Sequence, residues 1–188
     1  MTTGMSTRRP AGPAVEERAG QPYVGVRRTV TMDTFAVAGD RLPEIIGWLA
    51  ERGAAPAGPP FFRYRVIDMA GELEVEAGVP VAAPQPVGGG DGGDGGTAGT
   101  GGIGAELFNG TLPAGRYAVL THRGHPDELI EVTAGLLDWA AGRGLEWDMA
   151  ETAAGQRWGC RLESYLTDPR VEPDMSRWEV ELAFRLAR

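Results

Sequence analysis

Apolar and polar residues alternate along most of the chain beyond residue 22, and in two places the apolar spacing changes to that of a helix. The period of two that is typical of strands recurs in eight stretches: residues 24–30, 34–38, 61–67, 72–81, 106–112, 116–121, 158–166 and 178–186. Apolar residues three and four positions apart predict a helix at residues 42–52. The same spacing predicts a second helix that begins at Pro126 and ends before Gly142.

The predicted elements follow the same order in both halves of the chain: strand, strand, helix, strand, strand. Either half alone would leave one face of its sheet uncovered. Pairing the halves about a pseudo-two-fold axis buries those faces and leaves a groove between them. We therefore expect an α+β fold of two tandem βαββ-type repeats, with antiparallel sheets, helices on the outside and a ligand cleft at the junction.

Two stretches lack this periodicity. Residues 1–22 are rich in Thr, Arg, Pro, Gly and Ala and predict a disordered tail. Residues 84–104 are dominated by Gly and predict a flexible linker. The remaining chain forms one expected domain at residues 23–188, with repeat one at 23–83 and repeat two at 105–188.

Charge and composition exclude several classes of protein. The 188-residue chain has 26 Asp and Glu against 18 Lys and Arg, a formal net charge of −8. This charge disfavours nucleic acid or a membrane as a direct partner and mildly favours cationic or neutral ones. Every basic residue is Arg, which excludes a lysine Schiff base and a Walker-type phosphate loop. No apolar run approaches the roughly 18 residues of a membrane span, and we expect a cytoplasmic protein.

The sequence offers no evident set of metal ligands. Cys160 is the only cysteine, which excludes an intramolecular disulfide, and its position on a strand predicts a small buried residue. His122 and His125 are the only histidines, and no third ligand on a rigid element accompanies them. Loop or helix-cap positions fit both better, although a histidine such as His125 is suited to carry a proton in a cleft. We expect neither a metal nor a cofactor.

The stretch Arg-Leu-Glu-Ser-Tyr-Leu-Thr-Asp-Pro at residues 161–169 reads as a strand that ends at an Asp-Pro turn. A period of two places Glu163 and Tyr165 on one face with Arg161, opposite two leucines. Because the leucine face packs on a core, the Glu163 face must meet something else. A carboxylate and a phenol there, with indoles close in sequence, suit a pocket for flat, apolar, cationic molecules. An ordinary half-exposed strand with a solvated Glu is the alternative.

Other aromatic residues are candidates for the wall of such a pocket. With Glu163 and Tyr165, the candidate ligand-binding residues are Tyr64, Phe62, Trp158, Trp178, Trp147 and His125. Aromatic residues on strands are more often core, so each candidate has a structural alternative. Trp48 and Trp139 occupy matching positions on the two predicted helices, and we expect them to pack structurally.

Three stretches together resemble the GyrI-like family, whose fold also forms the effector domain of multidrug-responsive transcription activators. They are the Leu-Pro-Ala-Gly-Arg-Tyr-Ala-Val run at 112–119, Leu-Leu-Asp-Trp at 136–139, and Glu-Ser-Tyr-Leu-Thr-Asp-Pro at 163–169. The resemblance implies a cleft between two repeated units, with a central buried Glu that attracts lipophilic cations. Glu163 stands at that position and Tyr165 follows it. The Gly-rich insertion departs from the family pattern, and we expect a stand-alone member without a DNA-binding domain.

The resemblance leaves three functional hypotheses open. In the first, the protein binds lipophilic, often cationic aromatic molecules and so sequesters or senses toxic compounds. In the second, it is a hydrolase of cyclopropane-type electrophiles, in which Glu163 is the general base and Tyr165 holds the water or leaving group. In the third and weakest, it is a protein-interaction module such as a gyrase-binding inhibitor.

Overall fold

The computed structural model describes residues 12–68, 70–87 and 102–188. Within them, ten strands form one sheet, and every pair of neighbours is antiparallel. The strands are β1 (Ala14–Arg18), β2 (Gln21–Val30), β3 (Phe61–Ile67), β4 (Leu73–Pro80), β5 (Phe108–Leu112), β6 (Gly115–Arg123), β7 (Met149–Thr152), β8 (Gly155–Trp158), β9 (Arg161–Tyr165) and β10 (Glu179–Arg185). The helices are α1 (Ala36–Gly39), α2 (Arg41–Glu51) and α3 (Leu129–Ala141), with short 3₁₀ turns η1 (Ile103–Ala105), η2 (Pro126–Glu128) and η3 (Met175–Arg177). The predicted α+β class is confirmed.

The two halves of the chain meet in the middle of the sheet. The strand order is β1-β6-β10-β9-β3-β4-β2-β5, and the junction is the pairing of β9 with β3. Apart from β1, α1, β5 and the β7–β8 hairpin, each half runs strand, helix, strand, strand: β2, α2, β3 and β4 in the first, and β6, α3, β9 and β10 in the second. The β7–β8 hairpin interrupts the second unit, and both the tandem βαββ-type repeat and the axis that would relate its two units stay predictions.

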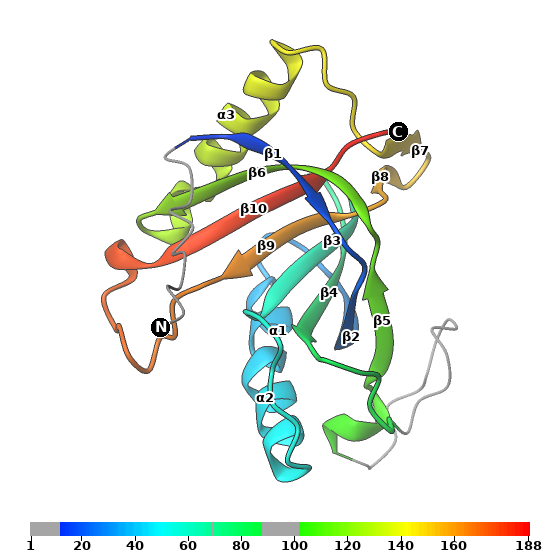
Figure 1. Ribbon diagram of the computed structural model, residues 1–188, viewed down its shortest axis with the longest axis vertical. Helices are drawn as coiled ribbons and strands as arrows, with labels where there is room; N and C mark the ends of the chain where they lie inside the picture. Colours follow the sequence, from blue (N-terminus) through cyan, green and yellow to red (C-terminus); the bar gives the residue numbers. More distant parts are fainter. Residues whose placement is uncertain (1–11, 69, 88–101) are drawn as a thin grey trace, which may run out of the picture.

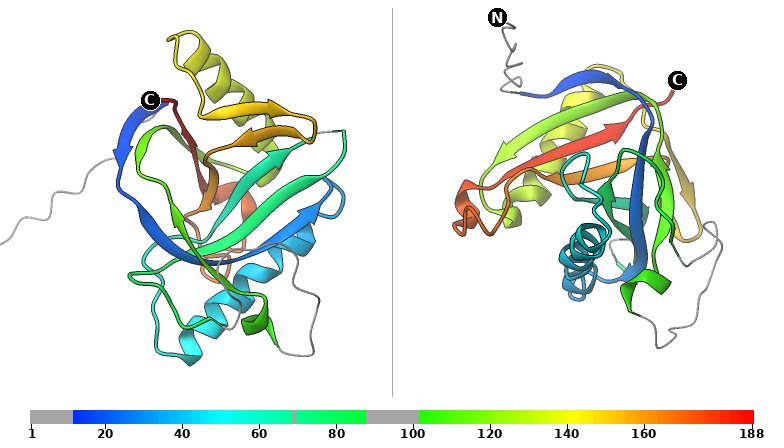
Figure 2. Two further views of the ribbon diagram at one scale, coloured as in Figure 1. Left: turned by 90° about the vertical axis from the view of Figure 1, so that its right-hand side faces the viewer. Right: turned by 60° about the horizontal axis from the view of Figure 1, so that its bottom comes forward.

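The helices lie toward opposite ends of a strongly curled sheet (Figure 1 and Figure 2). The main contacts of α3 are with β6, and those of α1 and α2 are with β2 and β4. The two central strands, β9 and β3, therefore lie between the areas that the helices cover. The ligand cleft expected at this junction stays a prediction.

Apolar clusters cover both faces of the sheet. The larger cluster joins Ile45 of α2 and Leu136 of α3 to strand residues such as Phe62 and Leu182, and thus marks the face that bears the helices. The smaller cluster lies on the opposite face and includes Leu162. The leucine face of β9 is therefore buried, as expected.

The two long helices form where apolar spacing predicted them. In α2 the buried side chains include Leu42, Ile45 and Leu49, which share one face of the helix. Gly53 follows with a φ of 67°, a conformation that glycine adopts without steric penalty at a helix end. In α3, buried Leu129 and Leu136 lie two turns apart.

Three expectations were wrong in detail. Residues 14–18 are not part of a disordered tail, because they form β1 and pair with β6. Residues 34–38 do not form a strand, since Phe35 precedes the one-turn helix α1. The hairpin of β7 and β8 was not foreseen, and the strand predicted at 158–166 is divided between β8 and β9.

Most of the Gly-rich linker predicted at residues 84–104 lies outside the described residues, as does the start of the predicted tail. The described part after it begins with η1, which contacts α2. Among the described helices, none is both long and apolar enough to cross a membrane.

Candidate functional site

Glu163 lies in the middle of β9, at the junction of the two halves. Its neighbours across the sheet are Phe62 on β3 and Leu182 on β10. Strand alternation therefore puts Glu163 on the face that bears the helices. The residue as a whole is half-buried.

Two phenols hold the Glu163 carboxylate. The Tyr165 hydroxyl donates to Oε1 at 2.5 Å, and the Tyr64 hydroxyl donates to Oε2 at 3.1 Å. Burial raises the pKa of Glu163, and the two phenol hydrogen bonds and the positive charge of Arg161 only partly oppose that shift. Burial and the neighbouring carboxylate also raise the pKa values of both tyrosines, which therefore remain neutral donors.

Aromatic rings surround these three groups. The ring of Tyr64 stacks on Phe35 with centroids 5.9 Å apart, and Phe35 meets Phe62 edge-on at 4.9 Å. Tyr165 lies edge-on to Phe62 at 5.7 Å and to Trp178 at 6.4 Å. The result is a continuous aromatic cluster beside one carboxylate, and aromatic faces next to a negative charge stabilise organic cations in proteins.

Arg161 lies two residues before Glu163 on the same face of β9. Its guanidinium carbon is 4.6 Å from the ring centroid of Phe184, 4.9 Å from that of Trp158 and 5.8 Å from that of Tyr64. Burial lowers the pKa of Arg161, although an arginine keeps its positive charge at neutral pH. The candidate site therefore contains groups of both signs.

The other predicted site residues fall into two groups. Trp158 is 3% exposed and packs with Trp147 and Phe184 at centroid distances of 5.7 Å each, so it belongs to the core beneath Arg161. Trp147 packs in the same cluster. His125 caps η2, where its Nδ1 accepts a hydrogen bond from the Asp127 amide, and none of its described contacts is with the Glu163 group.

Two residues of the candidate site around Glu163 were not predicted from the sequence. Phe35 was assigned to a strand, and its contact with Tyr64 depends on the turn before α1. Arg161 was placed on the correct face but not assigned to the site. Its position two residues before Glu163 on an alternating strand was the available signal.

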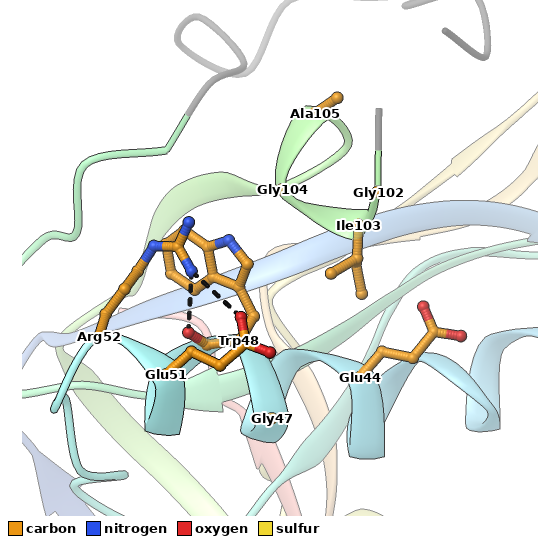
Figure 3. A pocket seen from close by; sticks show the side chains of 9 residues that line it. All are labelled: Glu44, Gly47, Trp48, Glu51, Arg52, Gly102, Ile103, Gly104 and Ala105. Atoms are coloured by element: carbon orange, nitrogen blue, oxygen red, sulfur yellow. Dashed lines mark hydrogen bonds and ion pairs between the residues drawn. The ribbon is translucent and has the colours of Figure 1, made fainter. Parts of the chain in front are cut away.

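A separate surface cavity of about 590 Å³ lies on the outer side of α2 (Figure 3). Its lining includes Trp48, Arg52 and Ile103. The Arg52 guanidinium stacks over the Trp48 ring at 3.9 Å and donates a hydrogen bond to the Trp48 carbonyl oxygen. These contacts within the protein account for its position in the cavity wall. The expected structural role fits Trp48, whose side chain is 7% exposed.

Metal binding has no support in the described part of the chain. No group of three or more His, Cys, Asp or Glu side chains there is arranged to hold an ion. His122 instead contacts Glu128 at 2.7 Å. Cys160 is fully buried, as expected, and burial raises the pKa of its thiol, which disfavours a nucleophilic role.

Solved structures of low sequence identity share this fold. The C-terminal domain of EcmrR matches with a TM-score of 0.62 at 16% identity, over 94% of this chain and 97% of that domain. In an EcmrR–DNA complex the TM-score is 0.65 at 17% identity over 94% of this chain, which spans only 57% of that protein. SAV2435 bound to tetraphenylphosphonium matches with a TM-score of 0.56 at 11% identity, over 93% of each chain.

A hydrolase from Listeria innocua matches with a TM-score of 0.59 at 13% identity, over 96% of this chain and 94% of that one. No curated protein sequence matches significantly. The family model for the GyrI-like small molecule binding domain matches residues 13–187, which is nearly the whole chain. The chain therefore belongs to the GyrI-like family of small-molecule binding domains.

Proposed function

We propose that this protein binds lipophilic, often cationic aromatic molecules on the aromatic surface around Glu163, and that it sequesters or senses such compounds. The observation that carries the proposal is the half-buried Glu163 carboxylate, whose hydrogen-bond partners are two neutral phenols. A carboxylate in these surroundings loses hydration without gaining a contact cation. A cationic ligand would place a positive charge in contact with the Glu163 carboxylate, which no described side chain does.

The expected energies favour this reading. A cation 4 Å from the Glu163 carboxylate gains about 4 kcal/mol at the effective dielectric constant typical near a protein surface. Each well-placed aromatic face adds about 0.5 to 2 kcal/mol. Tyr64, Tyr165 and Trp178 are partly exposed and offer such faces, whereas Phe62 is buried behind them. The structure of SAV2435 with tetraphenylphosphonium, an aromatic cation, agrees with this ligand class for the fold.

The direct test is binding of a cationic rhodamine ester, followed by dye anisotropy and by quenching of tryptophan fluorescence. We expect saturable binding to the wild type and at least tenfold weaker binding to Glu163→Gln, which keeps the size of the side chain and removes its charge. Glu131→Gln removes the same charge from an exposed position on α3 and serves as the control. Equal affinity in wild type and Glu163→Gln contradicts the proposal. A complete lack of dye binding turns attention to a protein partner, to be sought by pull-down.

A hydrolase is the second candidate, because a carboxyl group of raised pKa beside a phenol also suits general base catalysis. In this mechanism Glu163 takes a proton from water while the water oxygen bonds to a cyclopropane carbon. The ring C–C bond breaks, its electron pair moves to the activating group, and a proton is taken up there. Tyr165 orients the water. The similarity in fold to a hydrolase from Listeria innocua supports this alternative.

Turnover separates the two candidates. A hydrolase consumes a cyclopropane-bearing electrophile catalytically and loses that activity in Glu163→Gln. A binding protein takes up the same compound without forming a product. Chromatography of the reaction mixture after many molar equivalents of substrate distinguishes these outcomes.

A further inference from the structure

The cation site proposed above does not use Arg161, although this residue shares the strand face of Glu163. Two residues along a strand advance by about 6.6 Å, so the two side chains start close together and point the same way. Their charges are opposite, and yet they form no contact ion pair among the described residues. The presence of an arginine without a contact ion pair beside Glu163 therefore needs an explanation.

The surroundings of Arg161 hold the guanidinium in place but do not satisfy its donors. The rings of Phe184, Trp158 and Tyr64 flank it, and such stacking favours a fixed, flat guanidinium. Its Nε is buried without an acceptor, and within the described chain the guanidinium has no hydrogen bond or ion pair. Of the five N–H donors of this guanidinium, the one on Nε is buried, and buried donors in folded proteins almost always have partners. An acceptor from outside the described chain would complete this group.

The charge of Arg161 also limits the ligand. A molecule with only positive charge that lies against Glu163 would lie within one Debye length of the Arg161 cation, where salt screens their repulsion poorly. A molecule that also carries a carboxylate turns this repulsion into attraction. Guanidinium and carboxylate match in geometry and form charge-assisted, often paired, hydrogen bonds.

Building on the proposed function, we propose that the site selects amphoteric aromatic molecules. The cationic part of the ligand lies against Glu163, and its carboxylate binds the guanidinium of Arg161. Arg161 would thus determine specificity, whereas Glu163 and the aromatic rings supply the basic affinity. The inference rests on the proposed function, since it needs the cationic part to bind at Glu163.

Rhodamine B and its ethyl ester test this idea, because they share one cationic ring system and differ only in a free carboxylate. We expect the wild type to bind rhodamine B about ten- to a hundredfold more tightly than the ester, the range of a charge-assisted hydrogen bond. In Arg161→Met, which keeps an apolar stem against the rings, this preference should disappear or reverse. Arg161→Lys should retain part of it. The ratio of the two affinities is the readout, because a general loss of packing weakens both dyes alike.

Arg157→Met is the matched control, since Arg157 is exposed on the neighbouring strand β8 and its loss changes the net charge equally. We expect the wild-type ratio in this variant. A ratio that stays the same in Arg161→Met, or a wild type that prefers the ester, overturns the inference. If both dyes then still bind and Glu163→Gln weakens both, the proposed function stands without it. If neither dye binds the wild type, both fail.

Discussion

Two glutamates on opposite faces of one sheet, one fully buried and one half-buried, differ in the side chains that surround their carboxylates. Glu76 on β4 is fully buried, and the Tyr23 hydroxyl donates to its Oε2 at 2.5 Å. Arg27 donates to its Oε1 at 2.7 Å. The guanidinium groups of Arg63 and Arg65 lie within 3.6 Å of its oxygens. Glu163 also accepts a phenol hydrogen bond of 2.5 Å, but no guanidinium from residues 12–68, 70–87 or 102–188 is in contact with it.

Glu76 is therefore a structural carboxylate, paired with arginines of the protein itself, whereas Glu163 is an available carboxylate, without a contact cation in the described part of the chain. The charge of Glu76 is neutralised by the protein, and its network joins β4 to β2 and β3 on the side of the smaller apolar cluster. The charge of Glu163 is opposed only from a distance, by the Arg161 guanidinium, and burial raises its pKa. A carboxyl group with a raised pKa and no contact cation supports the proposal that Glu163 belongs to a binding site.

The largest effect should come from removing the structural carboxylate. Glu76→Gln leaves several guanidinium groups without their counter-ion, and breaking a buried ion pair costs about 3 to 5 kcal/mol of unfolding free energy. Urea denaturation measures this loss. Glu74→Gln is the control, because its contacts with Arg27 and Arg65 are 3.8 and 3.9 Å long and partly exposed, worth less than about 1 kcal/mol. Equal, small losses in both variants would remove the distinction between the two glutamates.

Removing the Tyr165 hydroxyl should lower the affinity of the Glu163 site for a cation, and this effect should be smaller than the stability loss in Glu76→Gln. Tyr165→Phe deletes the shorter hydrogen bond to Glu163 and so disfavours its charged form, which lowers the affinity for a cationic rhodamine ester by about tenfold, or about 1.4 kcal/mol. Tyr117→Phe is the matched control, since the Tyr117 hydroxyl donates to the Pro113 carbonyl oxygen in the other cluster. Dye titration that finds the same affinity in Tyr165→Phe and wild type would contradict this role.

The smallest expected effect is that of Glu163→Gln on the unfolding free energy of the ligand-free protein. Because the pKa of Glu163 is raised in the folded state, that state binds more protons than the unfolded chain above the usual glutamate pKa of about 4.3. Wild-type stability should therefore decrease as pH rises through this window. Glu163→Gln escapes the penalty and should be about 0.5 kcal/mol more stable at pH 7, with a smaller gain near pH 4. Thermal unfolding at both pH values checks the sign, and a destabilised Glu163→Gln at pH 7 would contradict it.

Local patterns in the sequence predicted much of this molecule. The period of two placed Glu163 and Tyr165 on one face, and helical spacing located α2 and α3. The contact of Tyr64 with Glu163 needs the pairing of β3 with β9, which joins residues about one hundred positions apart and leaves no local signal. Tyr64 was named only because of its residue type.

Non-local pairing also explains the errors. The short strand β1 is stabilised by β6 from the far half of the chain, so a polar stretch without periodicity became ordered. Phe35 and Val37 alternate with alanines as in a strand, but the residues form one helical turn. The network of Glu76 was not recognised, because its members come from β2, β3 and β4 and only their pairing brings them together.

The most direct test is an NMR titration of the Glu163 side-chain carboxyl carbon, with and without a saturating cationic rhodamine ester. Tyr64, Tyr165 and Arg161 are the titratable groups that face it, and none of them changes charge near the glutamate transition. We predict a pKa above the usual 4.3 in the free protein and a clear decrease when the dye binds, because a bound cation favours the charged form. A normal pKa that the dye leaves unchanged would contradict the claim that Glu163 is the available charge of this fold.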